Sequence, residues 1–162
     1  MRPTPGRRDG PGAGRPGTTL VEVMIVALLI GVFAAMAIPS YRTSVEQARA
    51  DLAAANLRTL WAAERLYYLE NRASTSDPDH LVALGVLQAG EIQVLGGGKT
   101  FTMYNDPAYV YEIDSNNDGT FDAVAARASG TSFSGILAID AAGVVTGEVV
   151  DTGGRVVRPG FR

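Results

Sequence analysis

The sequence contains no cysteine and a single histidine, His80. Without cysteine the chain forms no disulfide, and one histidine does not supply the nitrogen and sulfur ligands of an ordinary zinc site. A Ser–His or Cys–His catalytic pair would have to be built around His80, and no other nucleophile–base pair stands out. We therefore expect a protein that is not an enzyme, in which His80 is a surface or half-buried structural residue.

The sequence also lacks the signals of nucleic-acid binding and of nucleotide binding. The formal net charge is −3 and no basic face is evident, so we expect no nucleic-acid partner. Residues 96–100 read GGGKT, like the end of a phosphate-binding loop, but Gln93 stands where that motif needs another glycine. The residues after Thr100 look strand-like, whereas a phosphate loop leads into a helix. We interpret residues 96–100 as a plain loop.

The most distinctive feature that is present is an apolar run from Thr18 to Ile38. As a helix this run would be about 31 Å long, close to the thickness of the hydrocarbon core of a bilayer. We expect it to lie in a membrane. Glu22 is its one charged residue, and an acid inside a membrane needs a partner or a function.

A short leader precedes this run. Residues 1–17 are rich in glycine and proline, and their charged residues are Arg2, Arg7, Arg8, Arg15 and Asp9. Such a segment cannot build a core, and we expect it to be disordered. Its positive charge next to an apolar span predicts that the leader stays in the cytoplasm and that the rest of the chain lies outside.

The junction between these two segments resembles a known processing signal. The leader ends at Gly17, the sequence continues as Thr18-Thr19-Leu20-Val21-Glu22, and Pro39 and Tyr41 follow the apolar run. A basic leader ending in glycine, with glutamate as the fifth residue after it, is similar to the signal of type IV pilins and type II secretion pseudopilins. The resemblance is strongest from Gly17 to about Ala73.

The resemblance implies a processing and assembly route. A prepilin peptidase would cut between Gly17 and Thr18 and then methylate the new amino group of Thr18, although the family usually has Phe or Met at that position. Glu22 would pair with the N-terminal ammonium of a neighbouring subunit, which fixes the stagger because a buried charge without a partner is costly. In filaments of the family the helix loosens near a proline such as Pro39, and Gly31 would mark the other end of that segment.

The implied partners and location follow from the same resemblance. The partners would be the prepilin peptidase, copies of this chain and other pilin or pseudopilin subunits, a platform protein of the inner membrane with its assembly ATPase, and inner-membrane lipid. The protein would cross the bacterial inner membrane once, with its C-terminal domain in the periplasm, and then enter an extracytoplasmic filament.

An ordinary secretory signal is the alternative for the N-terminal segment. Ala35-Met36-Ala37 is an Ala-x-Ala cleavage site after a basic region and an apolar run. Cleavage there would release a soluble protein that begins at Ile38. The length of the run and its interruption by Glu22 favour the membrane interpretation.

After Pro39 the pattern predicts that the helix continues to about residue 73, with a kink rather than an end at Pro39. Its apolar residues recur at roughly helical spacing, with Glu46, Arg49, Glu64 and Arg65 between them: Val45, Ala48, Leu52, Leu57, Leu60, Trp61, Tyr67 and Tyr68. We expect this apolar face to pack on a globular domain. The aromatic residues Trp61, Tyr67 and Tyr68 are expected in its core.

The remaining sequence predicts a short helix and then strands. Asp77 can cap a helix that starts at Pro78. Four candidate strands, separated by Asn/Asp-Gly, Ser-Gly and Ala-Gly turns, follow at residues 109–113, 121–127, 134–140 and 144–150. The predicted fold is α+β and pilin-like, with a long N-terminal helix packed on a small antiparallel sheet. The predicted segments are a leader (1–17), a transmembrane and assembly helix (18–38), its amphipathic continuation (39–73), a connecting loop with a short helix (74–107) and an antiparallel β domain (108–162).

The turn after the first of these strands resembles part of a calcium-binding loop. Oxygen-bearing residues stand at positions one, three, five, seven and nine of the pattern, with Gly119 at position six: Asp114, Asn116, Asp118, Thr120 and Asp122. The bidentate glutamate at position twelve is missing, since Ala125 stands there. The sequence makes this loop a candidate Ca²⁺ site, and a polar hairpin turn is the alternative.

Together these features predict a structural subunit of a type IV filament, either a type IV pilus or a type II secretion pseudopilus. The alternative is a membrane-anchored or secreted calcium-binding domain that does not assemble.

Overall fold

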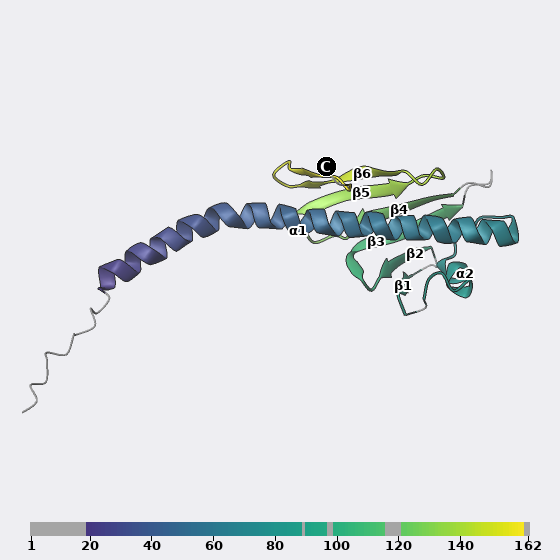
Figure 1. Cartoon of the computed structure of the whole chain (residues 1–162), viewed down its shortest axis with the longest axis horizontal. Coiled ribbons are helices and arrows are strands. Elements are labelled where there is room, and N and C mark those ends of the chain that lie inside the picture. Colours follow the sequence, from purple (N-terminus) through teal and green to yellow (C-terminus); the bar gives the residue numbers. More distant parts are fainter. Residues whose placement is uncertain (1–18, 89, 97–98, 116–120, 161–162) are drawn as a thin grey trace, which may run out of the picture. The chain divides into compact units, whose positions relative to one another are not determined.

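The computed structural model describes residues 19–88, 90–96, 99–115 and 121–160. The chain divides into two units at Pro39, the first ending there and the second beginning at Ser40. Helix α1 (Leu20–Asn71) has 52 residues and belongs to both units (Figure 1). It contains Pro39 in its interior, so the helix continues past the proline as predicted.

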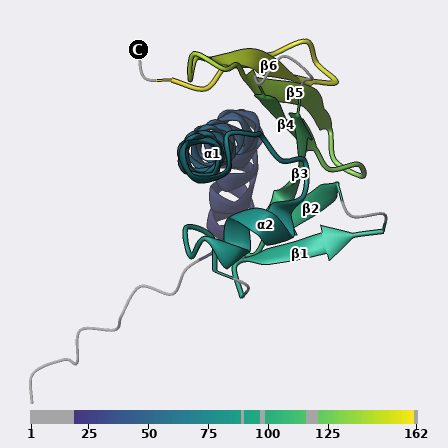
Figure 2. The same cartoon turned by 90° about the vertical axis from the view of Figure 1, so that its right-hand side faces the viewer.

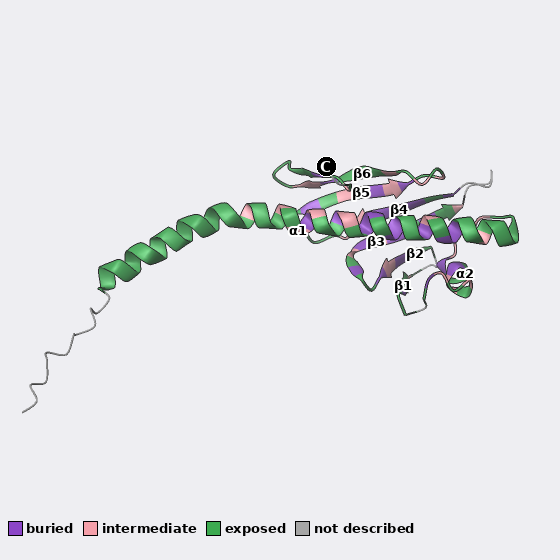
Figure 3. Ribbon diagram, in the orientation of Figure 1, coloured by how far each residue is buried: buried purple, intermediate pink, exposed green. Residues whose placement is uncertain are grey.

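In the second unit, the C-terminal part of α1 lies along one face of a sheet (Figures 1 and 2). The helix buries a regular stripe of residues at alternating spacings of four and three, which all face that sheet: Glu46, Ala50, Ala53, Leu57, Leu60 and Glu64. Small alanines in this stripe allow the helix backbone to approach the strands closely. Figure 3 shows that the buried residues of α1 lie in its C-terminal part, along the sheet, whereas its N-terminal part is exposed.

This stripe corrects two parts of the predicted helix face. Ala48, Leu52 and Tyr68 were expected on the packed face but are exposed. Glu46 and Glu64 were expected between the apolar residues, and both are almost completely buried. Leu57 and Leu60 are buried as expected, and the rest of the face was misjudged because it carries small alanines and two glutamates, while other leucines lie on the outer side.

Helix α2 (Pro78–Ala83) confirms the predicted cap. The Asp77 carboxylate accepts a hydrogen bond from the Asp79 N–H, and Pro78 occupies the first turn, where its missing N–H costs nothing. Between the two helices Arg72 adopts a left-handed φ of 57°, which ends α1. Leu81 of α2 is fully buried in the core.

The sheet has seven antiparallel strands that pair in chain order, as a continuous meander. The strands are β1 (Ile92–Leu95), β2 (Thr100–Met103), β3 (Asp106–Ser115), β4 (Phe121–Arg127), β5 (Phe133–Ile139), β6 (Val145–Asp151) and β7 (Val156–Val157). The long helix on an antiparallel sheet confirms the predicted α+β, pilin-like fold. The four predicted strands correspond to β3, β4, β5 and β6.

The sheet begins earlier than the sequence indicated. Strands β1 and β2 lie within residues 92–103, in the segment where a connecting loop with a short helix was expected. The strand-like character predicted for the residues after Thr100 is confirmed by β2. Thr100 begins β2 and no helix follows it, which agrees with the rejection of a phosphate-binding loop at residues 96–100. The two-residue strand β7 was also missed, because so short a run carries no periodic signal.

The core lies between α1, α2 and the inner face of the sheet. Alternation along β3 places Tyr109, Tyr111 and Ile113 inside and Glu112 outside. Trp61 is partly buried against this core, and its indole N–H donates to the Ala141 carbonyl at 3.1 Å. Of the three aromatic residues that the sequence placed in the core, Trp61 and Tyr67 pack against it, and Tyr68 does not.

Candidate functional site

The apolar N-terminal part of α1 presents a continuous exposed surface. Every residue from Leu20 to Ile38 is exposed, including bulky side chains such as Phe33 and Met36. The helix is long and apolar enough to cross a membrane, and none of its apolar window is buried by the rest of the chain. An uninterrupted apolar surface of this length requires a lipid or protein environment that covers it.

Glu22 lies near the start of this surface, and its position is fixed by a helix cap. The Glu22 N–H donates to the Thr19 hydroxyl at 3.2 Å, so Thr19 caps the helix and Glu22 is the third residue within it. The Glu22 side chain is exposed, and within the described residues no salt bridge reaches it. An acid on an apolar surface is therefore available to a partner from outside the chain.

The other predicted assembly residues, Gly31 and Pro39, lie on the same helix. Gly31 lies in the exposed helix, and a Cβ added to it would meet nothing within 4 Å. Pro39 is half-buried within the continuous helix. The predicted processing residues Gly17 and Thr18 lie outside the described part of the chain.

Two of the five predicted calcium ligands are described. Asp114 at the end of β3 and Asp122 at the start of β4 are exposed cross-strand partners, so the loop between them is a hairpin connection. Asn116, Asp118 and Thr120 lie outside the described residues. Among the residues that are described, no group of three or more His, Cys, Asp or Glu side chains is arranged to hold a metal ion.

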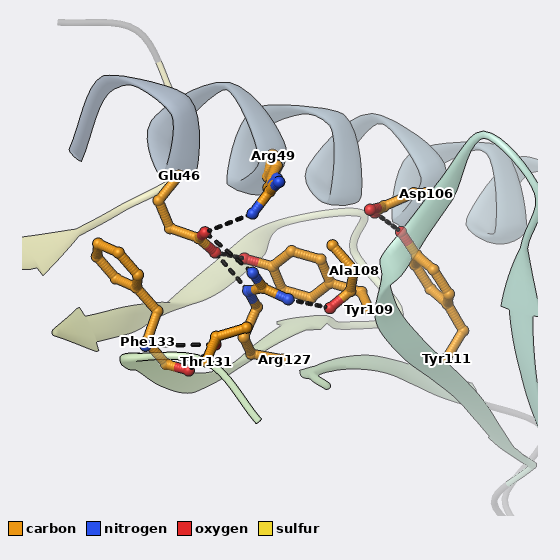
Figure 4. Close-up of polar contacts among 9 residues, drawn as sticks. All are labelled: Glu46, Arg49, Asp106, Ala108, Tyr109, Tyr111, Arg127, Thr131 and Phe133. Atoms are coloured by element: carbon orange, nitrogen blue, oxygen red, sulfur yellow. Dashed lines mark hydrogen bonds and ion pairs between the residues drawn. The ribbon is translucent and has the colours of Figure 1, made fainter. Parts of the chain in front are cut away.

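A buried ion pair, which the sequence interpretation missed, joins α1 to the sheet (Figure 4). The Arg127 Nε lies 2.6 Å from one carboxylate oxygen of Glu46, and its Nη2 lies 3.1 Å from the other. Both side chains are almost completely buried, at 3% and 2% exposure. The remaining Arg127 nitrogen, Nη1, donates to the Ala108 carbonyl at 2.6 Å. This two-pronged geometry satisfies both charges and fixes α1 against β4.

Tyrosines of β3 extend this polar layer beneath the helix. The Arg127 guanidinium lies over the Tyr109 ring, 5.5 Å from its centre. Further along the strand, the Tyr111 hydroxyl donates to Asp106 at 2.6 Å and accepts from the Asn56 side chain at 3.0 Å. Burial raises the pKa of the Asp106 carboxyl, and the hydrogen bond from Tyr111 opposes that rise. Every one of these groups has a partner, so we assign the layer to structure rather than chemistry.

A shallow pocket of about 240 Å³ opens beside this layer. It is lined by residues of α1 that follow Pro39 closely and by residues at the β4–β5 connection: Tyr41, Arg42, Val45, Glu46, Arg49, Arg127, Thr131, Ser132 and Phe133. No pocket was predicted here from the sequence, because its two walls are far apart in the chain: Glu46 and Arg127, which meet in it, are separated by 81 residues.

Comparisons with known proteins find relatives of modest identity. The chain is 34% identical over 68 residues to the type II secretion system core protein G of Pseudomonas aeruginosa; the match covers 42% of this chain and 48% of that protein. It is 29% identical over 126 residues to two fimbrial proteins of Pseudomonas aeruginosa, with 75% of each chain covered. This chain thus spans about half the length of the secretion-system relative and three quarters of the fimbrial proteins.

The other two comparisons return no relative. No family model matches the chain, and no solved structure matches it. The similarity of this chain to known proteins therefore rests on individual relatives of modest identity. The helix-on-sheet fold described above is a separate observation.

Proposed function

We propose that the chain is a structural subunit of a type IV filament and that it polymerises through its N-terminal helix, and its similarity to a type II secretion core protein and to fimbrial proteins supports this proposal. The filament is either a type IV pilus or a type II secretion pseudopilus. The observation that supports polymerisation most directly is the fully exposed apolar helix with a single acid, Glu22, near its start.

The proposal includes a processing step. A prepilin peptidase cuts between Gly17 and Thr18 and methylates the Thr18 amino group. Before assembly the subunit is anchored in the inner membrane by residues 18–38, with its C-terminal domain in the periplasm. A platform protein and an assembly ATPase then transfer it into the filament.

Glu22 has a defined part in this assembly. Lipid covers apolar side chains as well as another helix does, so apolar contact alone gives little preference for one stagger between subunits. The Glu22 carboxylate pairs with the N-terminal ammonium of a neighbouring Thr18, and this pairing selects one stagger. Gly31 and Pro39 then bound the stretch of helix that adjusts when subunits pack.

The proposal is tested in cells by two measurements on the same strain. The first is the intact mass and N-terminal sequence of the membrane-extracted chain, with a start at Thr18 and one added methyl group expected. The second is the yield of sheared filaments. Glu22→Ala should leave the Thr18 start in place and abolish filaments, whereas the control Glu70→Ala, an exposed acid on the same helix, should leave both unchanged.

Other outcomes would identify the alternatives. A start at Ile38 would mean that the protein is secreted after Ala37. An intact Met1, with unchanged behaviour of Glu22→Ala, would mean a membrane-anchored domain that does not assemble.

We also propose that the loop from Asp114 to Asp122 binds calcium, with Asn116, Asp118 and Thr120 completing the oxygen ligands. The supporting observation is that Asp114 and Asp122 stand directly opposite each other on neighbouring strands. Residues directly opposite each other on neighbouring strands lie close together, and carboxylate oxygens are ligands that calcium prefers.

A further inference from the structure

The pocket beside the buried ion pair is amphipathic and carries excess positive charge. Its apolar part is formed by Tyr41, Val45 and Phe133, and two hydroxyl residues from the β4–β5 connection, Thr131 and Ser132, lie opposite the helix. Its charged residues are three arginines and one glutamate. The Glu46 carboxylate is already satisfied by Arg127, so the pocket has two further positive charges, those of Arg42 and Arg49.

These two arginines are available to a ligand. Arg49 approaches Glu46 only at 3.5 Å, and 47% of its side chain is exposed. Arg42 is exposed, and within the described part of the chain it makes no salt bridge. A guanidinium with free N–H groups binds phosphate oxygens in a two-pronged geometry.

The position of the pocket in the chain indicates the source of the phosphate. Arg42 is three residues beyond Pro39, less than one helical turn, and Arg49 is ten residues beyond it, less than three turns. Side chains of a helix lean toward its N-terminus, which is the direction of the apolar segment. Tyr41, an exposed aromatic residue at the same boundary, has the character of residues found at the headgroup level of a membrane.

We propose that this pocket binds the phosphate headgroup of an anionic phospholipid while the subunit is anchored in the membrane. Arg42 and Arg49 contact the phosphate, Ser132 offers a hydroxyl, and Val45, Phe133 and Tyr41 contact the less polar part of the same lipid. Free phosphate would use the arginines but not the apolar wall, and a zwitterionic lipid would not neutralise the two charges.

This inference rests on the proposed membrane anchoring, and the experiment separates the two. The full-length chain is reconstituted into nanodiscs that contain phosphatidylcholine and phosphatidylglycerol in equal amounts. Native mass spectrometry then counts the lipids that stay bound after the disc is disrupted. A chain that does not enter the discs would refute the anchoring, whereas a chain that enters them but retains both lipids equally would refute only the pocket.

The expected result is selective retention of one phosphatidylglycerol. A basic residue near an anionic lipid surface contributes about a factor of five in affinity, so Arg42→Gln/Arg49→Gln should lower retention roughly twenty-five-fold. The control is Arg58→Gln/Arg65→Gln, which removes two exposed arginines of the same helix outside the pocket and should retain the lipid normally. Arg42→Lys/Arg49→Lys keeps the charge and should retain most of the binding.

Three results would overturn the proposal. Equal loss in the control pair would show a general charge effect. Displacement of the lipid by inorganic phosphate at millimolar concentration would show a site for the free ion. A dimer that dissociates in Arg42→Gln/Arg49→Gln, with phosphatidylglycerol retention unchanged, would show that an acidic surface of a second copy occupies the pocket instead.

Discussion

At the scale of a single residue, Glu64 is the least satisfied polar group in the described part of the molecule. Its side chain is fully buried, one carboxylate oxygen accepts only the Thr75 N–H at 3.3 Å, and the other has no hydrogen-bond partner among the described residues. Burial raises the pKa of Glu64 from 4.5 to about 7, and the hydrogen bond from Thr75 partly opposes this rise. The folded protein therefore holds the proton of Glu64 more tightly than the unfolded chain does.

This tighter hold predicts that stability falls as the pH rises. The contribution of the protonated side chain is fully present below pH 4.5 and is lost as the pH rises through about 7. A shift of this size corresponds to about 3 kcal/mol in the free energy of unfolding. Urea unfolding of the wild type between pH 4.5 and 8 measures this decline. In Glu64→Gln the decline should disappear.

The side chain of His80 lies next to the same segment, with its Nδ1 2.8 Å from the Thr75 hydroxyl. His80→Gln is therefore the matched control, and it should keep the decline. The assignment to Glu64 is wrong if Glu64→Gln retains the wild-type pH dependence.

Glu46 and Arg127 differ from Glu64, because these two buried charges have hydrogen-bond partners. Removal of one member leaves the other buried and unpaired, so Glu46→Leu and Arg127→Leu should each lower the free energy of unfolding by about 3–5 kcal/mol. The double variant removes both charges and should lose clearly less than the sum of the two single losses. Chemical denaturation of all four proteins gives the coupling, and additive losses would contradict the pairing.

At the scale of the secondary-structure elements, the β5–β6 hairpin depends on two glycines that allow close backbone contact. Gly147 has φ +109°, and a Cβ placed there would collide with the Ile136 carbonyl oxygen of the paired strand. Gly135 has the same relation to the Glu148 carbonyl. The pleat at these positions therefore tolerates no side chain on the side that faces the neighbouring strand.

Gly147→Ala should consequently destabilise the protein by about 3 kcal/mol, because it combines an unfavourable φ with a clash against backbone. The matched control is Gly153→Ala, since a Cβ at Gly153 meets only the Asp151 carboxylate at an ordinary 3.5 Å. Thermal unfolding of the two variants provides the comparison. Equal midpoints would mean that the hairpin relaxes around the new methyl group.

The elements also show what sequence patterns can and cannot predict. Strands β3 to β6 were predicted because strong turn signals separate them and apolar residues alternate along them. The packed face of α1 was predicted only in part, because Glu46 and Glu64 fit the periodic stripe by spacing while their charge argued against burial. The main partner that makes the burial of Glu46 possible, Arg127, is 81 residues away, and sequence patterns do not reveal such pairs.

The candidate functional residues were also predicted only in part: the assembly helix was, and the pocket was not. The assembly helix and Glu22 carry a local signal, since a long apolar run with one acid is visible in the sequence itself. The pocket carries none, because Arg42 and Arg49 lie on one element and Phe133 on another. Only the folded chain brings the two walls together.

For the second unit as a whole, the C-terminal segment is held against α1 by hydrogen bonds instead of a disulfide. The Gln47 side chain donates to the Arg158 carbonyl at 2.8 Å, and the Gly160 N–H donates to the Asp51 carboxylate at 3.1 Å. Arg155 adds a contact to the Thr43 hydroxyl. In a chain without cysteine, these hydrogen bonds hold the C-terminal segment in place as a disulfide would. Unlike a disulfide, they do not depend on the redox state of the compartment.

The proposed calcium loop would stabilise the same unit at the connection between β3 and β4. Calcium at millimolar concentration should raise the thermal unfolding midpoint of the full-length chain, and a chelator should reverse the increase. Asp114→Asn/Asp122→Asn should remove the calcium effect. An unchanged midpoint with calcium would refute the site.

The ties between α1 and the end of the chain have a consequence for biosynthesis. Gly160 is 109 residues from its partner Asp51, and Arg127 is 81 residues from Glu46. At a synthesis rate of about 5–20 residues per second, the ribosome needs roughly 5–20 seconds to produce the strands and final residues that cover the helix. During this interval Glu46, Glu64 and the alanine stripe of the newborn helix are exposed to water. Until then one side of the second unit is open, and the residues up to Gly160 close it.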